Sequence, residues 1–180
     1  KGVDDNGSEA VALDKAGLIN LDDPEQLEKV ETYVEVTDFA ADKLADKDKG
    51  RRNGGKNSEK FVEDLVGNLD DVVDIAETAE SVGAKSDKAL DSVLENADQA
   101  KQLVEVVEVA AEVGAKDKEN LTSVFENADK ATDLKEVVQA ADDVGAKDKT
   151  NLASVFQNAD KATDLKEVVQ AADDVGAKDK

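Results

Sequence analysis

Apolar side chains recur along most of the chain with the spacing of amphipathic helices. One series comprises Leu121, Val124, Phe125 and Ala128. A second comprises Leu134, Val137, Val138, Ala141 and Val144. Both follow the i, i+3, i+4, i+7 rule of a helix that buries one face and exposes the other. The alternation of period two that marks a half-buried strand does not occur. The pattern therefore predicts pairs of helices and no sheet.

The same pattern returns every 31 residues. Residues 124–149 and 155–180 are identical except at Glu126 and Gln157, which are 31 positions apart. The same spacing links four glycines, Gly83, Gly114, Gly145 and Gly176. An earlier copy is three residues shorter, because Asn68 to Gly83 spans 15 residues and Asn96 to Gly114 spans 18. Repetition at this period is typical of chains built from stacked structural units.

The three-residue deletion decides between two interpretations of the unit. Within one helix of about 26 residues, the deletion would rotate the second half by ~60° and break up the buried face. A loop between two helices absorbs it at little cost. The junction at Gly67 reads as a helix end followed by an acidic helix start. We therefore predict an all-α fold of tandem 31-residue helix-turn-helix repeats, stacked as an α-solenoid or elongated helical array.

Helix boundaries in the repeat are marked by charge and by glycine. Asp133 and Glu136 resemble an acidic capping box at the start of the second helix. Gly145 is expected to end that helix in a left-handed conformation. Lys147 and Lys149 follow it, near the negative end of the helix dipole.

The chain divides into three regions. Residues 1–46 are expected to form a divergent N-terminal helical unit, with helices over Ser8–Ile19, from Pro24 to about Val36, and from Thr37 onward. Residues 47–57 contain no apolar side chain and read as a basic, glycine-rich linker. Four helical hairpins then follow, over residues 58–85, 86–116, 117–147 and 148–180.

Composition removes several kinds of chemistry. The chain has 44 acidic and 23 basic residues, a net charge of −21, and no His, Cys or Met. Thiolate and imidazole catalysis and Cys/His zinc sites are therefore impossible. A surface this acidic repels nucleic acid, and no apolar run approaches the ~18 residues of a membrane span. Paired acids such as Asp142 and Asp143 recur with the repeat, which indicates solvated charge and not a catalytic pair.

The strongest enzyme-like signal lies in the linker. Gly50 to Asn57 comes within one residue of the phosphate-binding loop G-x-x-x-x-G-K-[ST]. Asn57 replaces the hydroxyl that must ligate Mg²⁺, and the preceding segment is charged instead of a buried strand. We therefore expect a linker, no catalytic residue and no bound cofactor.

One set of candidate metal ligands recurs with the repeat. Asn127 and Asp129, with Asn158 and Asp160, place oxygen atoms in two equivalent turns, and such oxygens are the ligands that Ca²⁺ prefers. The alternative is that Asn and Asp close the turn through backbone hydrogen bonds. We favour turn closure and keep Ca²⁺ as the alternative.

The repeats indicate a structural role. Adjacent near-identical units present one surface many times along an axis, which suits spacing or multivalent binding. No polar capping helix follows the last repeat, so we expect further copies, in a longer parent chain or a neighbouring subunit, to cover its apolar residues. These are Leu165, Val168, Val169, Ala172 and Val175. We expect a structural segment of a bacterial surface or extracellular protein that self-associates end to end. A cytoplasmic location and a protein- or peptide-binding solenoid are the alternatives.

Overall fold

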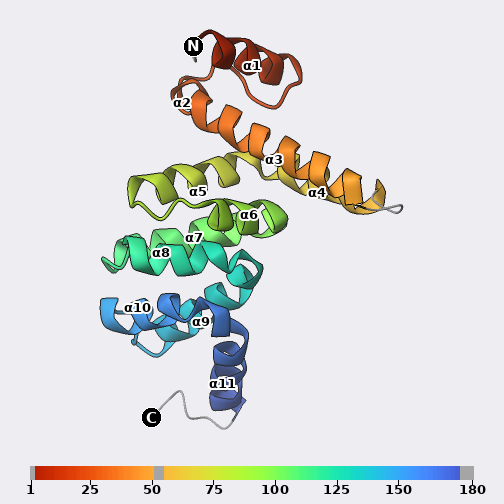
Figure 1. Ribbon diagram of the computed structural model, residues 1–180. Helices are drawn as coiled ribbons and strands as arrows, with labels where there is room; N and C mark the ends of the chain where they lie inside the picture. The colour runs from red at the N-terminus through yellow and green to blue at the C-terminus, as the bar shows by residue number, and fades with distance from the viewer. Residues whose placement is uncertain (1–2, 51–54, 175–180) are drawn as a thin grey trace.

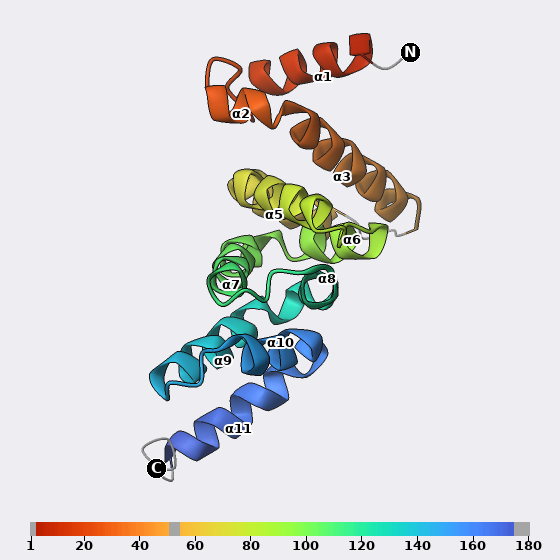
Figure 2. The same cartoon turned by 90° about the vertical axis from the view of Figure 1, so that its left-hand side faces the viewer.

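The computed structural model describes the backbone of residues 3–50 and 55–174 and the side chains of residues 7–45 and 58–172. Over these ranges the regular structure is helical and includes no strand, which confirms the predicted all-α class. The helices follow one another along an elongated body (Figures 1 and 2). Helix α1 (Val3–Lys15) lies at one end and α11 (Ala162–Asp174) at the other.

The N-terminal unit differs from the prediction in its helix boundaries. After α1 come α2 (Pro24–Glu28) and a single long helix, α3 (Val30–Gly50). A separate helix starting at Thr37 is therefore wrong. The Thr37 hydroxyl donates hydrogen bonds of 2.9 and 3.0 Å to the carbonyl oxygens of Tyr33 and Val34. It bonds back into its own helix and does not cap a new one.

The predicted linker is partly helical. Helix α3 extends to Gly50, and α4 (Gly55–Gly67) begins five residues later. Residues 47–50 and 55–57 thus belong to helices, and residues 51–54 lie outside the described part of the chain. The apolar pattern of α3 stops at Leu44, but a helix that already exists extends at low cost because nucleation is the expensive step.

From α5 (Leu69–Ser81) onward, short and long helices alternate. The short helices have nine residues each: α6 (Asp87–Glu95), α8 (Lys118–Glu126) and α10 (Lys149–Gln157). The long helices have 13 residues each: α5, α7 (Ala100–Glu112), α9 (Ala131–Asp143) and α11.

Each short helix passes into the next long helix through a three-residue 3-10 turn. The turns are η1 (Ala97–Gln99), η2 (Ala128–Lys130) and η3 (Ala159–Lys161). Between α4 and α5 only Asn68 intervenes. The copy that is three residues shorter in sequence thus lacks this turn, and its two helices are both present.

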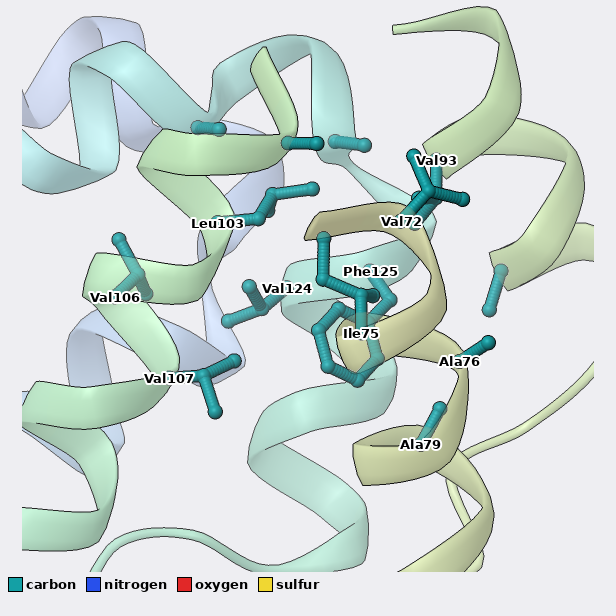
Figure 3. Packing of buried hydrophobic residues seen from close by; sticks show 14 of the residues in the cluster. Val72, Ile75, Ala76, Ala79, Val93, Leu103, Val106, Val107, Val124 and Phe125 are labelled. Atoms are coloured by element: carbon teal, nitrogen blue, oxygen red, sulfur yellow. The ribbon is translucent and has the colours of Figure 1, made fainter. Parts of the chain in front are cut away.

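The helices pack in two parallel rows. Helices α6, α8 and α10 contact one another in order, and α5, α7, α9 and α11 do the same in the second row. Helix α3 packs on α5, and α1 packs on α3. One continuous cluster of buried apolar residues runs between the rows from Ile19 to Ala162. Figure 3 shows part of it, where Phe125 of α8 lies beside Ile75 of α5.

Glycine follows the long helices α5, α7 and α9 in the left-handed conformation predicted for Gly145. Gly145 follows α9 with φ of +68°, and Gly83 and Gly114 have φ of +72° and +74° after α5 and α7. At Gly145 the backbone N–H donates to the carbonyl oxygen of Asp142, and the N–H of Ala146 donates to that of Ala141. These are the two bonds of a Schellman motif, which satisfies carbonyl groups that the helix leaves open.

The capping box predicted at Asp133 is wrong. Helix α9 has no side-chain cap from its own first turn, because η2 leads into it without an extended residue. Side-chain caps occur at the short helices, where Ser86, Asp117 and Asp148 each accept a backbone N–H. Asp133 is therefore free to bond elsewhere.

Candidate functional site

Two helices of identical sequence lie at the C-terminal end of the array. Helices α9 and α11 both read ATDLKEVVQAADD. Helix α9 lies between α7 and α11, whereas α11 packs on α9 and is the last helix of the described part of the chain. Equivalent side chains can therefore be compared in a covered and an uncovered setting.

The exposure of these equivalent residues differs strongly. Val137 in α9 is 5% exposed, and its counterpart Val168 in α11 is 66% exposed. Asp164, Glu167 and Ala171 are likewise exposed. With Val168 they lie at i, i+3, i+4 and i+7, so they share one side of the helix. We call these four residues the outer face of α11.

The residues predicted to mediate self-association fall into three groups. Val168 is on the outer face and exposed. Leu165, Val169 and Ala172 are half-buried. Val175 lies outside the residues that the structure describes. The sequence pattern identified the apolar stripe but did not separate its outer edge from the part that packs inward.

Polar bonds join α11 to α9. Asp133 accepts hydrogen bonds from the Thr163 hydroxyl at 2.7 Å and from Lys166 Nζ at 2.9 Å. Lys166 also donates to Glu136 at 3.1 Å. The bond from Thr163, followed by the Lys166 ammonium, holds the pKa of Asp133 below its usual value. The same carboxylates raise the pKa of Lys166.

Similar contacts join the preceding units. Lys135 of α9 forms an ion pair with Glu105 of α7 at 2.5 Å, 31 positions before the Lys166–Glu136 pair. In the other row Lys88 pairs with Glu126 at 2.6 Å. Ser92 accepts the backbone N–H of Ala128 at 3.1 Å. Each unit is thus tied to the next by side chains as well as by its core.

The N-terminal unit is tied to the array in the same manner. The hydroxyl of Tyr33 donates to Asp70 at 2.5 Å, and Lys29 pairs with Asp74 at 2.7 Å. Burial, with the bond to Asp70, raises the pKa of Tyr33 well above its usual value. The hydrogen bond to Asp74 raises the pKa of Lys29.

Two surface grooves follow the rows. One of about 450 Å³ lies between α5 and α7, with Ile75, Val104 and Val107 among its apolar lining and Glu77 and Glu108 among its acidic lining. Another of about 650 Å³ runs beside α4, α6 and α8, and its lining combines acids and lysines with the apolar side chains of Phe61 and Leu94. Both are open furrows between neighbouring helices. Neither encloses a reactive group.

The candidate calcium ligands are engaged in the turns. Asn127 and Asn158 donate through Nδ2 to the carbonyl oxygens of Ser123 and Ser154, at 2.8 and 2.9 Å. Asp129 pairs with Lys130 at 3.1 Å, and Asp160 is exposed. Within the described residues, no group of three or more acidic side chains is placed to hold a metal ion. The amides therefore close helix ends, and calcium binding stays a prediction.

Residues 51–54 of the phosphate-loop candidate lie outside the described backbone. The segment before it is the end of α3, where a phosphate-binding loop would follow a strand. Lys56 and Asn57 fall in the first turn of α4. Asp142 and Asp143 are exposed, and Asp142 lies 3.6 Å from Lys147 Nζ.

Two polar residues that the sequence patterns did not indicate form structural hydrogen bonds, Asn120 within its own helix start and Gln99 across a unit boundary. Asn120 is 1% exposed and donates through Nδ2 to the Ala115 carbonyl oxygen at 2.8 Å and to Asp117 at 3.0 Å. Gln99 bonds across a unit boundary to Thr132. An Asp and an Asn three residues apart recur at 117/120 and at 148/151, and this recurrence is the sequence signal that could have indicated Asn120.

Comparison of this chain with family models, with curated proteins and with solved structures yields no match. Among the described residues, no helix combines the length and the apolar composition that a membrane crossing requires.

Proposed function

We propose that this chain is a non-enzymatic structural repeat protein, an α-solenoid with a 31-residue period that acts as a spacer or scaffold and extends end to end. The observation that carries the proposal is the recurrence of equivalent contacts from unit to unit. Lys135–Glu105 and Lys166–Glu136 are the same pair, 31 residues apart. A unit that binds its neighbour by one face and offers the same face again has the geometry of an open array.

The surface chemistry supports a structural role. The chain has no His or Cys, and its carboxylates recur with the repeat, whereas an active site is a single concave feature. Its net charge of −21 keeps a rod soluble and disfavours nucleic acid as a partner. The partners we propose are further repeats, other copies of the chain, and other proteins. The proposed location is the cell surface or the extracellular space, with the cytoplasm as the alternative.

The test is the mass of the intact chain over a wide concentration range, measured by sedimentation velocity and light scattering. We expect growth into linear assemblies. Val168→Asp should abolish that growth, because it places a charge on the outer face of α11. Val62→Asp is the matched control, since Val62 is also exposed, at 41%, but lies on α4. A monomer at every concentration would contradict self-assembly.

Calcium is tested in the same experiment. Growth that requires millimolar Ca²⁺ and is lost in Asp129→Asn and Asp160→Asn would identify the turns as ligands. Growth that is indifferent to Ca²⁺ and to chelator would remove that proposal.

A second function is favoured by the groove between α5 and α7. Its apolar floor and acidic lining suit a basic amphipathic peptide, which would make the chain a protein- or peptide-binding module. We expect saturable binding of a labelled basic amphipathic peptide in fluorescence anisotropy, lost in Val104→Asp. A stable monomer that binds such a peptide would favour this function over self-assembly.

A further inference from the structure

The outer face of α11 has an exact chemical counterpart within the molecule. Its residues Asp164, Glu167, Val168 and Ala171 stand 31 positions after Asp133, Glu136, Val137 and Ala140 of α9. In α9 these residues meet α11: Asp133 and Glu136 bind it through polar bonds, and Val137 and Ala140 are 5% and 7% exposed. The contact between α9 and α11 therefore shows what kind of surface fits the outer face of α11.

The uncovered surface extends to the short helix α10. Asn120 of α8 is 1% exposed, whereas its counterpart Asn151 in α10 is exposed, although both bond to an Asp three residues before them. Val124 is fully buried, and its counterpart Val155 is half-buried. Both rows of helices are therefore uncovered at the end that α10 and α11 form. A single helix lying on α11 would leave the α10 side open, so the missing cover is a pair of helices.

We infer that the outer face of α11, together with the adjoining side of α10, is a docking site for a helical hairpin of the α10–α11 type. The hairpin is recognised through a threonine and a lysine three residues apart. In the contact between α9 and α11, Thr163 and Lys166 supply these groups to Asp133 and Glu136. Asp164 and Glu167 offer the equivalent carboxylates, and no ion pair joins them to another described residue. This inference deepens the proposed function by naming what binds.

The contact between α7 and α9 shows what each carboxylate contributes to recognition. Glu105 of α7 occupies the position of Glu136 in α9, and it pairs with Lys135. The position of Asp133 is taken by Gln102, whose buried Oε1 has no hydrogen-bond partner. The hydroxyl of Thr132 bonds to Gln99 instead. The complete Thr-and-Lys recognition therefore needs the aspartate, and α11 carries it as Asp164.

Charge disfavours the symmetric alternative. If two copies paired through their α11 outer faces, Asp164 and Glu167 of both chains would place four carboxylates in one contact, and the outer face has no lysine to pair with them. Like charges placed opposite one another in a contact are destabilising. The docked hairpin therefore presents a face unlike the outer face of α11, as α11 does toward α9.

The test uses the intact chain lengthened at its C-terminus by one more copy of residues 150–180. Amide hydrogen exchange of α11 is compared in the native and lengthened chains. We expect the α11 amides to be protected at least about tenfold more in the lengthened chain, because a covered helix opens less often. Unchanged exchange of α11, with the added repeat helical by circular dichroism, would overturn the inference.

Charge reversal tests the recognition itself. Asp164→Lys with Glu167→Lys in the lengthened chain should remove most of the added protection, and changing the appended counterpart of Lys166 to Glu should restore part of it. Asp38→Lys with Asp42→Lys is the matched control, since both residues are exposed within α3. Protection that survives reversal on α11 would overturn the Thr-and-Lys recognition.

The outcome is separable from that of the proposed function. If the native chain stays monomeric but the appended repeat protects α11, self-assembly fails and the docking site stands. If native chains assemble while the appended repeat leaves α11 unprotected, the docking inference fails alone.

Discussion

Gln99 caps a helix of the next repeat through Thr132. The Oε1 atom of Gln99 accepts both the backbone N–H and the hydroxyl of Thr132 at 3.1 Å, and its Nε2 donates to the carbonyl oxygen of Asp129 at 3.2 Å. Thr132 is the second residue of α9, where the N–H has no partner within the helix. One unit thus supplies the cap that the next unit lacks.

Removing this cap should destabilise the array. We expect Gln99→Ala to lower the free energy of unfolding by about 1 kcal/mol, the usual effect of losing a helix cap. Urea unfolding followed by circular dichroism measures it. Gln157→Ala is the control, because the side chain of Gln157 is exposed. Equal effects of the two substitutions would contradict a capping role for Gln99.

The single tyrosine reports on the contact between the N-terminal unit and the array. Tyr33 is 2% exposed and bonds to Asp70, so its pKa is raised well above its ordinary value of about 10. Absorbance at alkaline pH should show no phenolate until the pH lies well above 10. Since the chain has no Trp, the signal belongs to Tyr33 alone.

The raised pKa of Tyr33 also makes the stability of the fold depend on pH. Above pH 10 the unfolded chain loses the phenol proton and the folded chain keeps it, so the free energy of unfolding should fall as pH rises. Below pH 10 this contribution is constant. Tyr33→Phe should make that alkaline decline smaller, and the decline that remains belongs to lysines whose pKa is also raised, such as Lys29 and Lys166. A normal tyrosine titration in the folded chain would contradict the buried bond to Asp70.

Asp133 should make the contact between α9 and α11 sensitive to acid. Its pKa is lowered in the folded chain, so its stabilising contribution is present above the unfolded value near 3.9 and is lost as pH falls through the folded value. We expect Asp133→Asn to cost about 1 kcal/mol at pH 7 and less at pH 2. Unfolding in urea at the two pH values measures this.

Asp164→Asn is the matched control for Asp133, because the two residues occupy the same position in identical helices. Asp164 is exposed and should change stability by less than about 0.5 kcal/mol in the native chain. Equal costs at the two positions would show that the bonds to Thr163 and Lys166 contribute nothing.

Gly145 should resist substitution more than Gly67 does. Gly145 has φ of +68°, where an L side chain costs roughly 1–2 kcal/mol, so Gly145→Ala should lower stability by about that amount. Gly67 is the last residue of α4 and has a negative φ, and the space that an alanine methyl group would occupy there is open. Gly67→Ala should therefore be neutral or stabilising. Thermal melts of both variants measure the contrast. A neutral Gly145→Ala would contradict the Schellman cap.

Local pattern predicted the elements well because their causes are local. Apolar spacing and the position of Gly145 depend on residues within one or two turns, and the structure has the helices and the left-handed glycine there. The sequence also contained the repetition, and the three-residue deletion matched the loss of a 3-10 turn. The predicted helix start at Thr37 was wrong. A threonine hydroxyl can cap a new helix or bond to a carbonyl oxygen of its own helix, and Thr37 does the second.

The amino-acid sequence by itself determined the helical class, the two helices of each unit and the apolar stripe that each helix buries, since these follow from side-chain periodicity. Only the tertiary structure decided which polar residues join one unit to the next. Asp133 looked like a cap of its own helix and instead binds Thr163 and Lys166, 30 and 33 residues later. Two helices with one sequence also differ in exposure, because burial depends on neighbours that no local pattern contains.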